Sequence, residues 1–507
     1  MPDPLTFEVL KEAVAGGSAA FRCRTKLGAI GEDGDKVFPS TYAGGVYAVE
    51  DRRIDGRIVR CVVLDSVQSQ ANRMEELLQE AFLPNWREMP TDGDPSDCDL
   101  PIVAVHVGRH GWITSLTAPH RIHDAILRDS ELNRTRFRDS AIGQAIVAAR
   151  LHNATAFYRF CPTSLIFGTW DSTAGEGLES AKIPRAVVSE IVGIDITPGV
   201  RTASRIDPLG IERMETTFYR RGKSGWTFEE SEADKKYKKG KGWTEDINQA
   251  DKDPSGKPIE TKPIIWGTKP SDINHGNVVP NIPRFEQKEV RDNNLGRLTD
   301  ILESNSLRLR VDLDSADSRL ESHTAFDSDR MRIRPGAIKP GGVTMAYALH
   351  TWTLSLTQLR RLRFPLDQSK ANEAEQRNCA ARTVLASLAI YGLALQQEQG
   401  YWLRSRCELI PIAAKEGNGA VLQLINADGT TADFQVPTIL AAKQLFEKAV
   451  HEAESESNAS AIHWEKQIIR LTPSPQLKKL VEMSEKRQPT GGEEEEVAVA
   501  DDAGDQN

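Results

Sequence analysis

KIPRAVVSEIVGIDITPGVRTASRIDP, residues 182–208, joins a long apolar run to a turn rich in arginine and hydroxyl side chains. Its Val187–Ile196 segment is dense in Val and Ile, which favours a β-strand. The preceding stretch, residues 157–173, reads FYRFCPTSLIFGTWDST, and its apolar run Ser164–Phe167 predicts another strand. Both runs end in glycine or small hydroxyl residues, which allow a backbone to approach a ligand closely. The region is therefore predicted to consist of strands whose ends can contact a ligand.

Arginines follow these predicted strands at their turns. They are Arg159, Arg185, Arg201 and Arg205. The planar guanidinium group matches the geometry of phosphate, so arginines clustered at turns favour a polyanionic ligand. Thr202 and Ser204 alternate with the last two arginines, which makes residues 201–205 the strongest candidate for a phosphate contact. No acid–base pair or nucleophile motif accompanies them, so the pattern indicates binding and not catalysis.

Three passages in this region carry a resemblance to a known family: TSLIFGTWDST (163–173), RAVVSEIVGIDI (185–196) and RTASRIDPLGIE (201–212). They resemble the backbone subunit of the type I-G (formerly I-U) CRISPR effector complex, a branch of the Cas-seven, RAMP-type family. Other passages match in the same order, namely LDSVQSQANRMEELL (64–78), FRDSAIGQAI (137–146), LSLTQLRRLRFP (354–365) and, more weakly, YWLRSRCELIP (401–411). The resemblance spans roughly residues 20–411.

The resemblance implies an α+β fold. Its palm would be a ferredoxin-like sheet of the RNA-recognition-motif type, with large insertions that form a thumb hairpin and finger-like helices. The thumb is expected at residues 183–206 or, as a second choice, at 226–266. A helix at Phe7–Val14, strands at Ala20–Leu27 and Arg57–Leu64 that could pair, and a helix at Ser69–Phe82 are compatible with such a palm.

Composition divides the chain into three parts. Residues 1–413 are predicted to form the palm with its insertions, of which 229–260 is charged, almost free of aliphatic residues and expected to be a mobile insertion. Residues 414–487 are predicted to be a C-terminal helical extension. Residues 488–507 are predicted to be a disordered acidic tail. We expect no internal repeat.

The helix predicted at residues 69–82 begins with small polar side chains and an arginine. Ser69, Asn72 and Arg73 lie within one turn of each other, and a helix N-terminus of this kind can hold a phosphate. The alternative is a capped helix whose Arg73 pairs with Glu76 or Asp65. The resemblance favours contact with guide RNA.

Further basic positions are candidates for contact with RNA. Arg138 and Ser140 lie in the matching FRDSAIG passage, and Arg109 lies in the loop HVGRH. Lys235 and Lys238 occur in KKYKKGKGW, where Tyr237 and Trp243 could stack on bases. A solvated loop is the alternative for this last segment, because many acids surround it. Arg404 and Arg406 could contact RNA or a neighbouring subunit.

Four histidines, His106, His110, His120 and His123, fall within 18 residues. A metal site would need facing ligands with a Cys or carboxylate partner, and the spacing does not favour one. A histidine near an arginine could act as a general base, so an RNA-cleaving RAMP-type ribonuclease in the His106–His123 region is the alternative function. We expect no metal, no cofactor and no catalytic residue.

Composition and charge restrict the ligands and the cellular compartment that are expected for the protein. The formal net charge is −9, and the segment 488–507 contributes acids without any Lys or Arg, so local potential and not the sum must attract a polyanion. The six cysteines form no CxxC pair, which is typical of reduced thiols. No apolar run of the length a membrane helix needs and no secretory signal are recognised. A cytoplasmic protein without membrane contact is expected.

The function expected from these features is that of a non-enzymatic, crRNA-binding backbone subunit. It would polymerise along the guide in a type I-G interference (Cascade) complex and support pairing of the guide with the target DNA strand. Its partners would be crRNA, the target DNA strand, further copies of itself in a helical filament and other type I-G effector subunits. A scaffold that binds no nucleic acid is a further alternative.

Overall fold

The chain has both helices and mixed sheets, and so is α+β as predicted. The computed structural model describes residues 2–42, 46–90, 98–172, 182–199, 216–222, 225–268, 273, 326–327, 332–333, 341–366, 371–412, 420–455 and 460–487. Two compact units result: Met1–Val200 with Thr299–Leu480 (unit 1), and Arg201–Leu298 with Val481–Asn507 (unit 2).

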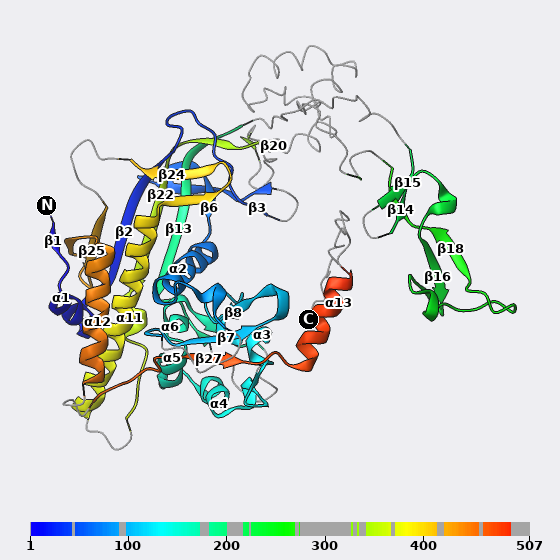
Figure 1. Cartoon of the computed structure of the whole chain (residues 1–507). Helices are drawn as coiled ribbons and strands as arrows, with labels where there is room; N and C mark the ends of the chain where they lie inside the picture. Colours follow the sequence, from blue (N-terminus) through cyan, green and yellow to red (C-terminus); the bar gives the residue numbers. More distant parts are fainter. Residues whose placement is uncertain are drawn as a thin grey trace, which may run out of the picture. The chain divides into compact units, whose positions relative to one another are not determined.

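Unit 1 is built on a ten-stranded sheet (Figure 1). Its main path runs, in order, through β1 (Asp3–Pro4), β26 (Thr431–Gln435), β25 (Val421–Asn426), β2 (Ser18–Ala29), β22 (Val343–Ser355), β13 (Val187–Pro198), β6 (Arg57–Asp65) and β5 (Val49–Ile54). The hairpin of β23 (Tyr401–Arg404) and β24 (Cys407–Pro411) joins at β2. All pairs are antiparallel except β1 with β26.

The long predicted strands are confirmed, with one change in their pairing. Asp55 and Gly56 both have positive φ, as the two-residue turn between β5 and β6 requires. The partner of β6 on its other side is β13, so the expected pairing of residues 57–64 with residues 20–27 is wrong. The later strand β22 lies between β2 and β13 instead.

The prediction of a strand at Ser164–Phe167 is wrong. Residues Thr163–Phe167 form the short helix α6, which Gly168 ends with a φ of +81°. Every residue of α6 is buried, so the run shows no periodicity that could distinguish a buried strand from a buried helix.

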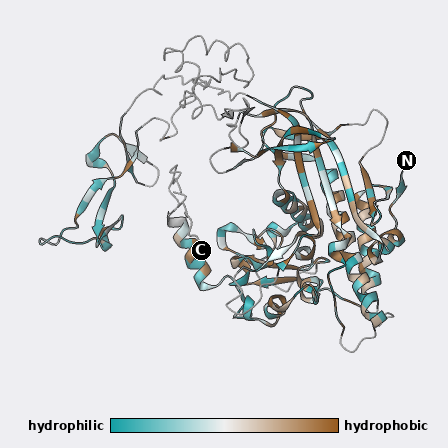
Figure 2. Cartoon of the chain, turned by 180° about the vertical axis from the view of Figure 1, so that it is seen from behind, coloured by the Kyte–Doolittle hydropathy of each residue, from teal (hydrophilic) through white to brown (hydrophobic). Residues whose placement is uncertain are grey.

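Helices α1 (Phe7–Ala15), α2 (Val67–Phe82), α11 (Ala371–Gln399) and α12 (Ile439–Glu454) cover one face of the large sheet (Figure 1). Figure 2 shows the strands from behind, with hydrophilic and hydrophobic residues alternating along them. The central helix α11 is apolar and long enough to span a membrane, but 89% of its most apolar window is buried inside the protein. Its apolar surface therefore belongs to the core, as expected of a helix that is apolar on all sides.

A smaller three-stranded sheet completes the described part of unit 1. β27 (Ile468–Leu471) pairs in parallel with β7 (Ile102–His106), and β7 pairs with β8 (Trp112–Thr114). The elements around it are α3 (Ala125–Arg128), α4 (Ala141–Ala148) and α5 (Thr155–Phe160). The prediction of a C-terminal helical extension at residues 414–487 is corrected: the segment contains helices, but β25, β26 and β27 also belong to sheets of unit 1. The acidic tail, 488–507, lies outside the described residues.

Unit 2 contains two three-stranded sheets. One has the order β15 (Gly225–Thr227), β14 (Phe218–Arg221), β19 (Ile265–Gly267), and the other β17 (Gly242–Thr244), β16 (Lys235–Lys239), β18 (Glu260–Pro263). The expectation that 229–260 is a mobile insertion is therefore corrected: it forms hydrogen-bonded strands. The expected absence of a repeat is also wrong, as shown below.

The remaining elements are short. They are β3 (Thr41–Tyr42), β4 (Val46–Tyr47), β9 (Glu131–Leu132), β10 (Thr135–Arg136), β11 (Thr169–Trp170), β12 (Lys182–Ile183), β20 (Phe326–Asp327), β21 (Arg332–Ile333), α10 (Leu356–Leu359) and α13 (Pro475–Arg487). The 3-10 turns used below are η3 (Arg121–His123), η4 (Phe137–Asp139), η5 (Glu230–Glu232) and η6 (Ile247–Gln249). The first expected thumb position, 183–206, contains β13, which is a central strand of the large sheet and not a projecting hairpin.

Candidate nucleic-acid interface

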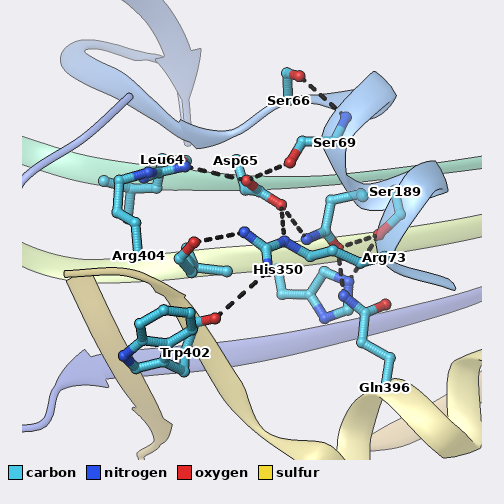
Figure 3. Close-up of polar contacts among 12 residues, drawn as sticks. Leu64, Asp65, Ser66, Ser69, Arg73, Ser189, His350, Gln396, Trp402 and Arg404 are labelled. Atoms are coloured by element: carbon cyan, nitrogen blue, oxygen red, sulfur yellow. Dashed lines mark hydrogen bonds and ion pairs between the residues drawn. The ribbon is translucent and has the colours of Figure 1, made fainter. Parts of the chain in front are cut away.

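Asp65, at the end of β6, is a fully buried carboxylate that organises the start of α2 (Figure 3). It accepts hydrogen bonds from Ser69 Oγ (2.8 Å), Arg73 Nε (2.9 Å) and Arg404 Nη2 (3.2 Å), and from Gln70 Nε2 (2.6 Å). The helix itself is capped by Ser66, whose hydroxyl accepts from the Ser69 amide. Burying a carboxylate is costly unless it is paired and hydrogen-bonded, and Asp65 meets both conditions.

The side chains of Ser69 and Arg73 therefore form hydrogen bonds within the chain, as in the alternative interpretation of this helix start, in which Arg73 pairs with Asp65. Arg73 also donates from Nη1 to the carbonyl of Trp402 (3.4 Å) and from Nη2 to that of Leu403 (2.6 Å). Asn72 is exposed on the same helix. We call the group formed by Asp65, Arg73 and Arg404 the Asp65 centre. It carries two positive charges and one negative charge, and both guanidinium groups are partly exposed.

A neutral polar chain lies next to the Asp65 centre, inside the sheet. Ser189 Oγ donates to Gln70 Oε1 (3.0 Å) and lies 2.8 Å from His350 Nε2, while His350 Nδ1 lies 3.1 Å from the Tyr401 hydroxyl. Burial lowers the pKa of His350 to about 4. The Ser–His contact resembles a nucleophile–base pair only in distance, because both residues are fully buried and a tyrosine takes the place of an orienting carboxylate.

A second buried carboxylate, Glu75, extends from α2 toward two further arginines. Arg121 binds it in a bidentate way, with Nε 2.7 Å from Oε1 and Nη2 2.6 Å from Oε2. Burial raises the pKa of Glu75 to about 7, while the charges of Arg121 and Arg185 oppose that rise. Glu75, Arg121 and Arg185 form what we call the Glu75 centre, which again has one positive charge in excess when Glu75 is ionised.

Arg185, predicted as a phosphate contact, is positioned by the backbone around α6. Its Nε donates to the carbonyl of Phe167 at 3.1 Å. A side chain at Gly168 would lie 2.8 Å from Arg185 Cγ and 3.1 Å from its backbone nitrogen, so the absence of a Cβ allows this close approach. Burial, followed by the charge of Arg121, lowers the pKa of Arg185, as expected for two cations held near one carboxylate.

The histidine region contains a third acid-anchored arginine. Arg138 Nη2 donates to Asp171 Oδ2 at 2.6 Å, and His123 Nδ1 lies 4.0 Å from the same oxygen. His123 is only 7% exposed, and burial lowers its pKa to about 4, so it is neutral at pH 7. His106 contacts the ring of Trp112, and His110 and His120 are exposed. Among the described residues no group of three or more His, Cys, Asp or Glu side chains could hold a metal.

The remaining candidates lie apart from these centres. Ser140 caps α4, donating to the Phe137 carbonyl (2.7 Å) and accepting from the Gly143 amide (3.1 Å). Arg159 forms an ion pair with Glu465, and Arg109 is exposed in a loop. In unit 2, Lys235 forms an ion pair with Glu260 and Lys238 is exposed. Arg201, Thr202, Ser204 and Arg205 lie outside the described residues.

Sequence reasoning named Asp65 as one possible partner of Arg73, but it did not select Glu75 as the acid that binds Arg121. The partners of these acids are up to several hundred residues away, as in the pairing of Asp65 with Arg404, and only the fold brings them together. The available signal was the position of Asp65 and Glu75 inside the LDSVQSQANRMEELL passage. Trp170 was also missed: it is 58% exposed, precedes Asp171 and lies 5.7 Å from the Lys182 ammonium.

Buried carboxylates thus hold arginines at two places beside α2. In a comparison with protein families, residues 21–198 match the family described as CRISPR-associated protein GSU0053. The matched segment includes Asp65, Glu75, Arg121, Arg138 and Arg185, and this similarity supports a CRISPR-associated protein. Comparison with curated proteins gave no match.

Proposed function

We propose that this protein is the crRNA-binding backbone subunit of a type I-G CRISPR interference complex. The palm would be its large sheet with the helices of one face, a ferredoxin-like arrangement enlarged by insertions. Copies of the chain would follow one another along the guide and support its pairing with the target DNA strand. Other effector subunits would end the filament, since a heterologous interface stays open unless something closes it.

The observation that carries this proposal is the charge balance of the two centres on α2. The Asp65 centre and the Glu75 centre each combine one buried carboxylate with two arginines, and each keeps one positive charge in excess. The Asp65 carboxylate holds Arg73 and Arg404 in place and the Glu75 carboxylate holds Arg121, while Arg185 is held by the Phe167 carbonyl. The excess charge would attract an anion. Both centres lie largely in the segment similar to a CRISPR-associated family, which favours nucleic acid as that anion.

The proposed subunit is non-enzymatic. A ribonuclease in the His106–His123 region would need a histidine that exchanges protons near pH 7 and reaches the substrate. His123 has a low pKa and is buried, and it is the histidine nearest to an arginine–carboxylate pair. This geometry favours a structural role for His123.

The test is to purify the full chain after expression with and without a CRISPR array. The ratio of absorbance at 260 and 280 nm and the mass distribution are measured before and after ribonuclease treatment. A guide-bound filament predicts a high ratio and a ladder of oligomers that collapses on digestion. If about five phosphates are neutralised per subunit, log affinity falls with log salt at a slope of about −3.5.

A low absorbance ratio and a single protomer mass in both preparations would argue against assembly on RNA. The same expression is then repeated together with the other effector subunits. If the complex forms without this chain in contact with crRNA, as judged by cross-linking, the proposed function is wrong. Cleavage of RNA by the pure protein, lost in His→Ala variants, would instead support the ribonuclease.

A further inference from the structure

Unit 2 contains a tandem repeat. YRRGKSGWTFEESEADK (219–235) and YKKGKGWTEDINQADK (237–252) share the order Tyr, two basic residues, Gly-Lys, Gly-Trp-Thr and a final Ala-Asp-Lys. The first copy is one residue longer. We call them repeat 1 and repeat 2.

The two repeats form the same local structure. In repeat 1 the Gly222 amide donates to Asp234 Oδ2 (3.0 Å), and in repeat 2 the Gly240 amide donates to Asp251 Oδ2 (2.8 Å). The amides of these two aspartates donate to the carbonyls of Arg220 and Lys238, both at 2.7 Å. Both glycines have positive φ, and a 3-10 turn, η5 or η6, precedes each aspartate.

The repeats also recruit a third strand in the same way. The Arg220 amide donates to Ile264 O and the Lys238 amide to Ile259 O, both at 2.9 Å. In return, Ile264 and Ile259 donate to the carbonyls of Asp234 and Asp251, both at 2.8 Å. Because equivalent residues make equivalent hydrogen bonds, the duplication in the sequence is a duplication of the fold.

Each repeat places a tryptophan directly opposite a basic residue across its hairpin. Trp226 pairs in register with Arg220, and Trp243 pairs with Lys238. Trp226 is 42% and Trp243 is 58% exposed. A directly opposed pair lies on the same face of the two strands, so each hairpin presents an indole beside a cation.

The surroundings of the two tryptophans differ. Trp226 contacts the rings of Phe218 and Phe228, and Arg220 opposite it is neutralised by Asp234 (2.9 Å) and Glu245 (2.6 Å). Repeat 1 therefore uses its aromatic residue in packing and its cation in ion pairs.

Trp243 has a lysine and an acid where Trp226 has two phenylalanines, and the acid, Glu245 at the position of Phe228, forms its ion pair with Arg220 of repeat 1. The Lys236 ammonium lies 3.7 Å from the centre of the Trp243 ring, at the position that Phe218 occupies in repeat 1. Within the described residues, neither Lys236 nor Lys238 forms an ion pair with a carboxylate. Repeat 2 thus presents an exposed indole between two lysines.

We propose that Trp243, Lys236 and Lys238 form a binding site for single-stranded nucleic acid, and that the equivalent position at Trp226 does not. A base stacks on the exposed indole of Trp243, and the two lysines contact its flanking phosphates. Stacking tolerates any base, because every base has a π-face. The site adds a nucleic-acid contact in unit 2 to the proposed function. The inference rests on that function because RNA is chosen as the first probe on its account.

The repeat supplies its own control. Full-length Trp243→Ala and Trp226→Ala are compared for binding of fluorescent oligouridine and oligothymidine across a range of salt concentrations. Trp243→Ala is expected to weaken binding about 5- to 100-fold, the range for loss of one stacked base. Trp226→Ala is expected to change affinity less than about twofold, since that ring is used in packing. Trp243→Phe, which keeps an aromatic face, should stay within about threefold of the wild type.

Equal effects of Trp243→Ala and Trp226→Ala, or no effect of Trp243→Ala, would overturn the site while leaving the proposed function intact. Binding of oligothymidine but not oligouridine, with the same dependence on Trp243, would support the site and count against the guide-RNA function. If the wild-type protein binds neither probe, the site is wrong, and the proposed function is decided by cross-linking in the complex with the other effector subunits. In Lys236→Gln/Lys238→Gln, the salt slope should be less steep by about 1.4 if each lysine neutralises one phosphate of a single strand.

Discussion

Arg121 holds the buried carboxylate of Glu75 with two parallel hydrogen bonds, although its own backbone lies in the left-handed region with a φ of 53°. Few residues other than glycine adopt this conformation, and it costs about 1–3 kcal/mol. The pair joins η3 to α2 through two residues that are 46 positions apart in the sequence. It therefore fixes the histidine-containing loop against the helix that carries both arginine centres.

The first prediction concerns the pH dependence of stability in Glu75→Gln. The pKa of Glu75 is raised to about 7 in the folded protein from an ordinary value near 4.5, so the folded state binds more protons than the unfolded state between these values. Its contribution to stability therefore falls as pH rises from about 4.5 to about 7. Urea midpoints at pH 5 and pH 7 should show a smaller difference in Glu75→Gln than in the wild type. An unchanged difference would contradict this assignment.

Asp65→Ala is predicted to destabilise unit 1 strongly. The change leaves Arg73 and Arg404 without their shared carboxylate, and breaking a buried ion pair costs about 3–5 kcal/mol. Asp51→Ala is the control, because Asp51 pairs with Arg60 at the surface, where such pairs contribute about 0–1 kcal/mol. Denaturant unfolding of both variants measures the contrast. Similar midpoints for the two would show that the Asp65 centre is dispensable for folding.

His350→Gln is predicted to make the protein less sensitive to acid while lowering its stability at neutral pH. The pKa of His350 is depressed to about 4, so neutral His350 stabilises the fold fully above about pH 6.5, and this contribution is lost as pH falls toward 4. At pH 7 the variant should lose about 1–3 kcal/mol if the hydrogen bonds to Ser189 and Tyr401 are not replaced. Unfolding curves at pH 7 and pH 5 test both parts, and equal acid sensitivity of the two proteins would refute the first.

Arg185→Ala is predicted to weaken RNA binding about 3- to 30-fold and to make the salt slope less steep by about 0.7, the value for one phosphate on a single strand. Arg87→Ala serves as a control, since Arg87 is 67% exposed and pairs with Glu80 away from both arginine centres. Titrations with a labelled guide at several salt concentrations supply both quantities. Equal losses in the two variants would mean that binding depends on overall charge and not on the Glu75 centre.

Local pattern predicted those elements whose two faces differ. Val187–Ile196 was recognised because β-branched residues favour a strand, and the helix predicted at Ser69–Phe82 corresponds to α2. The same reasoning failed at Ser164–Phe167, where complete burial removes the periodicity. It also failed in unit 2, where scarcity of aliphatic residues was interpreted as mobility, although Asp234 and Asp251 accept hydrogen bonds from the Gly222 and Gly240 amides and so order the hairpins.

The candidate site was less predictable than the fold. Arg73, Arg138 and Arg185 were named as candidates for contact with RNA, and that role stays a prediction. Asp65 was named beforehand as one possible partner of Arg73, whereas the pairing of Arg121 with Glu75 depends on a contact that no local pattern reveals. Ser140 shows the opposite case: its position at the start of a helix already indicates a cap, and the structure places it there. Residues 201–205, which carried the strongest prediction, remain a prediction.

The position of β22 between β2 and β13 has a consequence for the order in which the protein can fold on the ribosome. Both neighbours are synthesised before β22, and the strands of unit 2 emerge in the interval. At about 5–20 residues per second, roughly 7–30 s separate the end of β13 from the start of β22. During that time the nascent chain holds β2 and β13 without the strand that lies between them in the sheet. All the strands of unit 2 that the structure describes are thus synthesised before β22 can pair with β2 and β13. Chaperone binding to β2 and β13 at the positions that β22 later occupies should be confined to this interval.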